Sequence, residues 1–358
     1  MDNNGPIPGI EAVQPGVARR RAALKKIASF AALGAAPGSL LAPLSARAAP
    51  ARFAYKLGIA LAPSHPTTAG LKAACAEILS ESQGRLSIEV FPNSQLGSDT
   101  DMISQVRSGA IDFVSTAGLI WGTLVPVASI SGVGFAFADY QTVWSAMDGE
   151  LGAHIRAGFA KANLVPQARI WDHGFRHVTS STRQISAPAD LSGLKIRVPL
   201  SPALTSLFKA FGAAPAGINM AETYTALQTK VVDGQENPLT ILETQKLYEV
   251  QKYCSQTSHV WDGFWLVGNM RSWNALPEEL RQLAARTFDA HALRQRQAVD
   301  ALNTRLRDDL KAKGMAFNTP ALSPFRDVLR KSGFYQDWQK KFGAEAWARL
   351  EKYAGTLA

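Results

Sequence analysis

Short runs that alternate hydrophobic and polar residues begin after residue 50, and amphipathic helical runs separate them. Strands are predicted over 53–59, 86–90 and 111–114, because in each the hydrophobic side chains recur at every second position. Helices are predicted over 67–82 and 98–107, and a glycine follows each of them. This βαβαβ order predicts an α/β protein with a doubly wound sheet.

The same alternation returns over 194–198, where the hydrophobic residues fill one face and Arg197 points to the other. Ser201-Pro202 then begins a helix, with the serine as N-cap, and Gly212 ends it. Arg197 therefore lies at the carboxyl end of a strand, beside a helix N-terminus. Ligands bind at such positions in open α/β sheets, and a guanidinium group with five donors suits a carboxylate or a phosphate. The alternative, a structural arginine paired with an internal acid, stays open at this point.

Three further patterns describe the rest of the chain. The segment 115–137, rich in glycine, proline and hydrophobic residues, is expected to form loops at strand ends. A helix is predicted over 239–250 and a strand over 261–266, and 168–171 is predicted to be a strand that leads out of the first domain. The amphipathic run 277–313 predicts a helix on the order of 55 Å long, which is longer than one domain needs.

The first 48 residues have the composition of an export signal. Basic residues at 19–26 precede a run rich in alanine and leucine, and Ala46-Arg47-Ala48 matches a small-x-small cleavage site. Arg20-Arg21 fits the twin-arginine export pattern, with Ala23 where phenylalanine is more usual. Cleavage near Ala48 is expected, with an uncleaved membrane anchor or the general secretory route as alternatives, and a periplasmic location follows.

Composition and motifs exclude several function classes. The formal charge of +9 falls to about +5 without residues 1–48, and the basic residues form no stripe of the kind that binds nucleic acid. Cys75 and Cys254 are expected to be buried free thiols, with a long-range disulfide as the alternative. His173 and His177 are four residues apart, but the glycine and β-branched residues between and after them disfavour the helix that a metal site would need. No metal or other cofactor is expected.

The order and spacing of several segments resemble the solute-binding subunits of TRAP transporters, the DctP-type family. The most informative are LKIRVP at 194–199, ETYTALQ at 222–228 and VVDGQENPL at 231–239. Further similar segments are FPNSQLG at 91–97, SGAIDF at 108–113, GFRHVTS at 174–180 and KLYEVQKYCSQTSHV at 246–260. Together they cover nearly the whole chain after the export signal.

The resemblance implies a two-lobed periplasmic-binding-protein fold, with a doubly wound sheet in each lobe and a long helix between them. Lobe I is expected to comprise 49–173 plus 263–302, and lobe II 174–262 plus 303–358. The implied function is an extracytoplasmic receptor that binds a small organic acid by its carboxylate and delivers it to the membrane subunits of a transporter.

Six residues are candidates for ligand contact. The resemblance assigns the carboxylate to Arg197 and Arg176, and it places a contact at Asn237, whose amide both donates and accepts. Trp121 is either a cavity wall or core. Relatives that bind sialic acid carry charged residues where this chain has 115–121, and this departure favours a less polar monocarboxylate, such as a 2-oxo or aromatic acid. The candidate ligand-binding residues are Arg197, Arg176, Asn237, Trp121, Met220 and Phe264.

Two other functions are weighed against the receptor. A secreted enzyme is disfavoured, because the chain lacks the HExxH, GxSxG, P-loop and CxxC motifs. A sensory binding module without a transporter would have the same sequence features, and genes for membrane subunits beside this one would distinguish the two.

Overall fold

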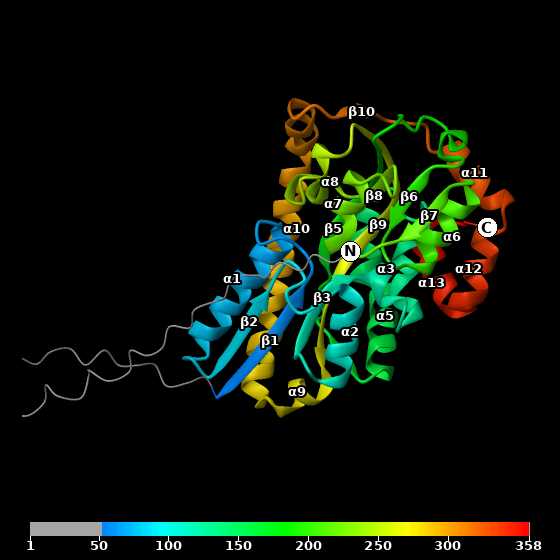
Figure 1. The fold of residues 1–358 in the computed structure, drawn as a ribbon. Helices are drawn as coiled ribbons and strands as arrows, with labels where there is room; N and C mark the ends of the chain where they lie inside the picture. Colours follow the sequence, from blue (N-terminus) through cyan, green and yellow to red (C-terminus); the bar gives the residue numbers. More distant parts are fainter. Residues whose placement is uncertain (1–51, 358) are drawn as a thin grey trace, which may run out of the picture. The chain divides into compact units, whose positions relative to one another are not determined.

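A single mixed sheet of ten strands organises the protein, for which the computed structural model describes residues 52–357 (Figure 1). Its main path runs β2-β1-β3-β9-β5-β8-β6-β7, and β4 and β10 each pair with β9 outside this path. The strands are β1 (Phe53–Ile59), β2 (Leu86–Phe91), β3 (Phe113–Ala117), β4 (Leu164–Pro166), β5 (Trp171–Ser180), β6 (Lys195–Val198), β7 (Ala214–Gly217), β8 (Gly234–Asn237), β9 (Tyr253–Asn269) and β10 (Ala316–Asn318).

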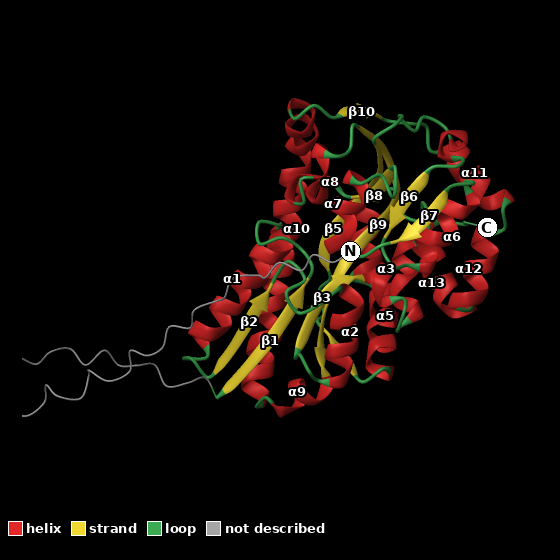
Figure 2. Ribbon diagram, viewed as in Figure 1, coloured by secondary structure: helices red, strands yellow, loops and turns green. Residues whose placement is uncertain are grey.

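Helices connect the strands and pack against the sheet (Figure 2). They are α1 (Pro66–Glu81), α2 (Asp99–Ser108), α3 (Gly118–Trp121), α4 (Tyr140–Met147), α5 (Glu150–Lys161), α6 (Pro202–Ala210), α7 (Met220–Gln228), α8 (Leu239–Thr244), α9 (Met270–Ala275), α10 (Glu278–Ala312), α11 (Ser323–Lys331), α12 (Phe334–Phe342) and α13 (Ala344–Ala354), with short 3₁₀ helices η1 (Pro126–Gly132), η2 (Pro188–Leu191) and η3 (Leu247–Glu249). Among these helices, none is both long and apolar enough to cross a bilayer.

Two long antiparallel strands, β5 and β9, lie in the middle of the sheet. They join its first part, β2, β1 and β3, to its second part, β8, β6 and β7. The end of β9 pairs with β3, whereas its start pairs with β10, and β5 follows it along most of its length. The register of β5 against β9 shifts at Gly174, whose φ of 118° is a conformation that glycine adopts readily. The bulge lies beside the two β5 side chains that matter most below, His173 and Arg176.

The long helix predicted over 277–313 is confirmed as α10, a continuous run of 35 residues. Pro277 precedes it, Glu278 and Glu279 occupy its first turn and Lys311 its last, in agreement with the helix dipole. It contacts α1 near the start of the chain and α8 in the second part of the sheet (Figure 1). The helix therefore bridges the two parts, as its length indicated.

The predicted strands over 53–59 and 86–90 and the first two helices are confirmed within two residues, and so is α6, which begins after the N-cap Ser201. Three predictions were wrong in detail. The expected loop 115–137 contains α3 and η1; the helix expected over 239–250 ends at Thr244, because Lys246 adopts a left-handed φ of 53°; and the strand expected over 168–171 begins only at Trp171. The strand expected over 261–266 is the middle of the much longer β9.

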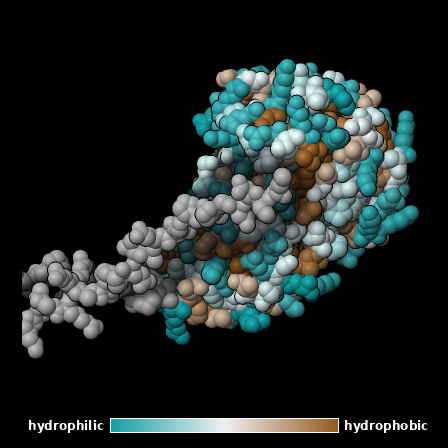
Figure 3. Space-filling view, viewed as in Figure 1, coloured by the Kyte–Doolittle hydropathy of each residue, from teal (hydrophilic) through white to brown (hydrophobic). Residues whose placement is uncertain are grey.

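A continuous hydrophobic core lies between the sheet and its helices, and it includes the indole rings of Trp121, Trp171, Trp261 and Trp265. Figure 3 shows one face of the molecule, on which hydrophilic residues predominate and hydrophobic atoms gather in a few places. Cys75 and Cys254 are buried free thiols, as expected.

Candidate functional site

Polar side chains from both parts of the sheet converge on one small cavity, called here the central cavity. Strands β5 and β9 line one side of the cavity, and the segments at the carboxyl ends of β1, β2, β3, β6, β7 and β8 line the rest. Its volume is about 20 Å³, room for about one water molecule. The lining residues are Ala60, Leu61, Asp99, Ala117, Ile120, His173, Arg176, Arg197, Pro199, Met220, Asn237 and Phe264.

Arg197 is a buried cation without an acidic partner among the described ion pairs. Its side chain lies off the hydrophobic face of β6, as the alternation predicted, and it is only 1% exposed. Nε donates to the carbonyl of Ile218 at 2.8 Å, while Nη1 has no hydrogen-bond partner. Burial lowers the pKa of Arg197 to about 10, and Arg176 also lowers it, against the opposing charges of Glu236 and Asp99. The group still carries its charge at neutral pH, and that charge lacks a counterion in contact.

Arg176, by contrast, is already paired. Its Nε and Nη2 donate to the two carboxylate oxygens of Glu236 at 2.6 and 2.7 Å, and Nη2 also donates to the Glu236 carbonyl. His259 Nε2 lies 3.1 Å from the same carboxylate. Although burial opposes both charges, the pair raises the pKa of Arg176 and lowers that of Glu236. Arg176, and not Arg197, is therefore the arginine that is paired with an internal acid.

A second carboxyl group lies beside this pair. Oδ2 of Asp262 is 3.6 Å from Nη1 of Arg176 and has no hydrogen-bond partner, while Oδ1 accepts from the backbone of Gly263. Burial raises the pKa of Asp262 to about 7, despite the nearby guanidinium. Of the two carboxyl groups beside Arg176, Glu236 is therefore ionised at neutral pH, whereas Asp262 titrates near neutrality.

Asn237 ends β8 and lines the cavity with its amide. Its Nδ2 donates to Oε1 of Gln235 at 2.5 Å, whereas its Oδ1 has no partner. The proline that follows keeps the backbone of Asn237 extended, in agreement with the sequence. Two residues of the cavity lining thus each carry one buried polar atom without a partner, the acceptor Oδ1 of Asn237 and the donor Nη1 of Arg197.

Sequence reasoning missed two lining residues with ionisable side chains. Asp99 is the first residue of α2, and its Oδ1 accepts from the hydroxyl of Thr116; burial raises its pKa. The His173 ring lies 4.5 Å from that of Phe264, tilted by 48°, and burial holds the pKa of His173 well below its usual value, so the ring is neutral. A carboxylate in the first turn of a helix is usually explained by the helix dipole, so its position in the sequence did not mark Asp99 as a cavity residue.

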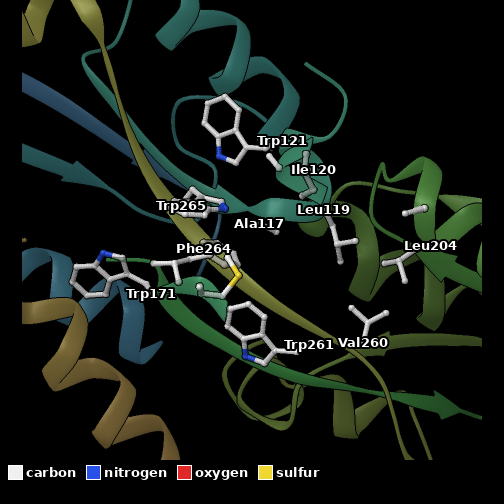
Figure 4. Close-up of a cluster of buried hydrophobic side chains, with 14 of the residues drawn as sticks. Ala117, Leu119, Ile120, Trp121, Trp171, Leu204, Val260, Trp261, Phe264 and Trp265 are labelled. Carbon is white, nitrogen blue, oxygen red and sulfur yellow. The ribbon is translucent and has the colours of Figure 1, made fainter. Parts of the chain in front are cut away.

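Five of the six predicted site residues line the central cavity, and Trp121 does not. The Trp121 ring meets Phe159 edge-on at 5.0 Å, and Phe159 also contacts Trp265. Trp265 and Phe264 are consecutive in β9 and so point to opposite faces, which places Trp121 on the face away from the cavity (Figure 4). Of the two roles considered for Trp121, the structure favours core. Within residues 52–357, no group of three or more metal-ligating side chains is found.

Comparison with known proteins agrees with the motifs. Residues 57–340 match the family described as bacterial extracellular solute-binding protein, family 7, DctP. The uncharacterized protein y4mM of Sinorhizobium fredii is 35% identical over 293 residues, which are 82% of this chain and 52% of y4mM. The 2,3-diketo-L-gulonate-binding periplasmic protein YiaO of Escherichia coli is 34% identical over 65% of this chain and 71% of its own. The chain thus spans about half the length of y4mM.

A solved structure extends the likeness to the fold. The TRAP periplasmic solute-binding protein from Polaromonas sp. JS666, bound to D-erythronate, superposes with a TM-score of 0.80 at 30% identity, covering 86% of this chain and 99% of that one. The family consists of solute receptors and not of enzymes. By motif order, sheet topology and these matches, the chain belongs to the DctP family of bacterial extracellular solute-binding proteins, the receptor subunits of TRAP transporters, and has their two-lobed α/β fold.

Proposed function

We propose that the central cavity binds a small organic acid by its carboxylate and that the receptor delivers this acid to the membrane subunits of a TRAP transporter. The observation that carries the proposal is the state of Arg197, a buried guanidinium with an unpaired donor and no carboxylate in contact among the described residues. A buried charge is stable in a protein when an opposite charge is near it. A ligand carboxylate supplies that charge.

The other lining residues divide the work. Arg176 lines the cavity beside the ligand, and Glu236 balances its charge. Asn237 orients the ligand, and Met220 and Phe264 contact its carbon skeleton. Trp121 supports the cavity from the opposite face of β9 and makes no contact with the ligand.

Ligand entry requires the walls of the cavity to separate, because about 20 Å³ holds no organic acid. We assign the moving parts to the expected lobes, 49–173 plus 263–302 and 174–262 plus 303–358. Asp99 lies on the first of them and Arg197 on the second, so their separation opens the cavity. Closure around the ligand then strips water from Arg197 and strengthens its ion pair with the acid.

The receptor works outside the cytoplasm. Residues 1–48 serve as the export signal, cleaved near Ala48, and the twin-arginine pair sets the route; this segment lies outside the described residues. A periplasmic location agrees with the names of the relatives.

Calorimetric titration of the mature protein tests the proposal, with D-erythronate, succinate, D-lactate, L-lactate and pyruvate as probes. Arg197→Ala removes one partner of a buried charged pair and should weaken binding by about 2–5 kcal/mol, or roughly 30- to 4,000-fold. Arg197→Lys keeps the charge but loses the planar donor group, and should remain strongly impaired.

Arg286→Ala is the matched control, since Arg286 is an exposed arginine on α10 whose contact is with Glu81. It should bind as the wild type does. Wild-type affinity in either Arg197 variant would refute the carboxylate site.

A further inference from the structure

We infer that Asn237 offers the cavity only a hydrogen-bond acceptor, so that the receptor selects acids with a 2-hydroxyl group over the corresponding 2-oxo acids. This inference rests on the proposed function, because it takes Arg197 as the partner of the ligand carboxylate. It differs from the sequence-based expectation of a less polar monocarboxylate, such as a 2-oxo or aromatic acid, which rested on the residues at 115–121.

A chain of four buried side chains fixes the orientation of the Asn237 amide, and the chain begins at Gln251. One of the two terminal amide atoms of Gln251 lies 2.9 Å from the carbonyl of Val250 and 3.5 Å from that of Asp233. Carbonyl groups only accept, so this atom is the nitrogen, Nε2. The other amide atom, which lies beside Thr179, must then be the oxygen, Oε1.

Each following step has one solution. Gln251 Oε1 lies 2.9 Å from the hydroxyl of Thr179, which donates its single proton there, since the other acceptor in reach, the carbonyl of Gln235, is at 3.4 Å. The Thr179 oxygen is left to accept at 2.8 Å from Gln235, which must present Nε2. Gln235 Oε1 then accepts at 2.5 Å from Asn237, which must present Nδ2. The direction of the chain thus follows from two backbone carbonyls and not from the similar shapes of amide oxygen and nitrogen.

The consequence is an acceptor aimed into the cavity. Asn237 is fully buried, its Oδ1 has no partner, and it lines the same space as Arg197. Asp99, on the opposite wall, adds a carboxyl group that also accepts when ionised. Among the lining side chains, Arg197 and Arg176 are cationic donors and the neutral ring of His173 carries one N–H, whereas Asn237 Oδ1 and an ionised Asp99 accept.

A 2-hydroxy acid satisfies both kinds of group. Its carboxylate accepts from Arg197, and its hydroxyl donates to Asn237 Oδ1. A 2-oxo acid brings a second acceptor against Oδ1 and leaves both oxygens buried and unpaired, which is the situation that binding sites reject most strongly. A 2-amino acid supplies a donor, but its positive charge lies close to two guanidinium groups.

Matched pairs of acids test the inference by titration calorimetry: D- and L-lactate against pyruvate, and D- and L-glycerate against hydroxypyruvate. In each pair the better hydroxy acid should bind about 10- to 100-fold more tightly than the oxo acid. The readout is the ratio of the two affinities, because a general loss of binding leaves that ratio unchanged.

Thr179→Val tests the chain of side chains. It preserves the shape of the side chain and removes the hydroxyl, so that Gln235 and Asn237 are free to reverse their amides. The affinity ratio should fall toward one in Thr179→Val and stay as in the wild type in Thr179→Ser, which keeps the hydroxyl. The wild-type ratio alone decides the selectivity if the valine variant does not fold.

Two results overturn the inference in distinguishable ways. Equal affinity for the members of each pair, or tighter binding of the oxo acids, with both lost in Arg197→Ala, refutes the selectivity and leaves the carboxylate receptor standing. Binding of acids that Arg197→Ala does not weaken refutes the proposed function, and the selectivity falls with it.

Discussion

Replacing Arg197 by methionine should make the ligand-free protein more stable while it removes carboxylate binding. Burial depresses the pKa of Arg197 from 12.5 to about 10. For a base whose folded pKa is below its unfolded pKa, the charged form is disfavoured in the folded state at every pH below about 10. At pH 7 this shift corresponds to about 3 kcal/mol of destabilisation.

Methionine also removes one favourable contact, the hydrogen bond from Nε to the carbonyl of Ile218. Losing it and leaving that carbonyl unpaired costs about 1–2 kcal/mol. The expected net effect of Arg197→Met is therefore a gain of about 1–2 kcal/mol in the free energy of unfolding.

Arg176→Met is the matched comparison, because both arginines line the same cavity and are equally buried. Removing Arg176 leaves the Glu236 carboxylate buried without its bidentate partner. Breaking such a pair from one side costs about 3–5 kcal/mol. The same substitution at two neighbouring arginines should thus change stability with opposite sign.

Urea unfolding of the three proteins at pH 7, without ligand, measures both effects, and calorimetric titration checks that Arg197→Met no longer binds an acid. If Arg197→Met loses as much stability as Arg176→Met, Arg197 is a structural residue and the reasoning from its unpaired donor is wrong.

Three further predictions concern pH, the β5 bulge and the thiols. Stability should fall as pH rises from about 4 to 7, because the buried Asp262 and Asp172, each with a pKa of about 7, keep protons that the unfolded chain loses near 3.8. Urea titrations at successive pH values should show a smaller fall in Asp262→Asn than in the wild type. Gly174→Ala should lower the free energy of unfolding by about 1–3 kcal/mol, because φ is 118° and the added Cβ would meet a proline ring at 3.2 Å. Gly193→Ala is the control in the same thermal unfolding assay and should cost less, since its φ is 68° and its Cβ would lie in open space. Cys75 and Cys254 should react with a thiol reagent only after unfolding, since both are buried and burial raises the pKa of each, to about 12 for Cys75; rapid reaction of the native protein would contradict this.

Local pattern was enough to predict where Arg197 lies. Alternation along β6 put its side chain off the hydrophobic face, and Ser201 with the following proline marked the helix that begins beside it. These signals operate within a few residues, where the physics of strands and caps is local. The predictions made from these local signals agree with the structure more closely than any others for the site.

Which of the two arginines is paired depends on the register between distant strands. Glu236 reaches Arg176 because β8 pairs antiparallel with β5, so that Val178 lies opposite Glu236. The sequence gives no measure of that register. For the same reason the chain from Gln251 through Thr179 to Asn237, which joins residues up to 72 positions apart, left no local signal.

Trp121 and the 239–250 helix show a second limit, where packing overrides the local signal. Trp121 belongs to the short helix α3, and contact with Phe159 decides its direction. The helix after Leu239 ends at Thr244 although neither glycine nor proline stands there to end it; Lys246 takes the left-handed conformation instead. The direction of Trp121 is thus decided by a residue distant in the sequence, and the end of the helix by the backbone conformation of Lys246.

The unpaired charge of Arg197 also explains how a ligand could control closure. The cavity of about 20 Å³ buries this charge, and in the closed form that burial costs about 3 kcal/mol, which opposes closure in the absence of a ligand. A bound carboxylate removes that penalty and so shifts the balance to the closed state. Arg197→Met removes it without a ligand, so the ligand-free variant should scatter X-rays at small angles as a more compact particle than the ligand-free wild type. Identical scattering from the two would mean that burial of Arg197 does not oppose closure.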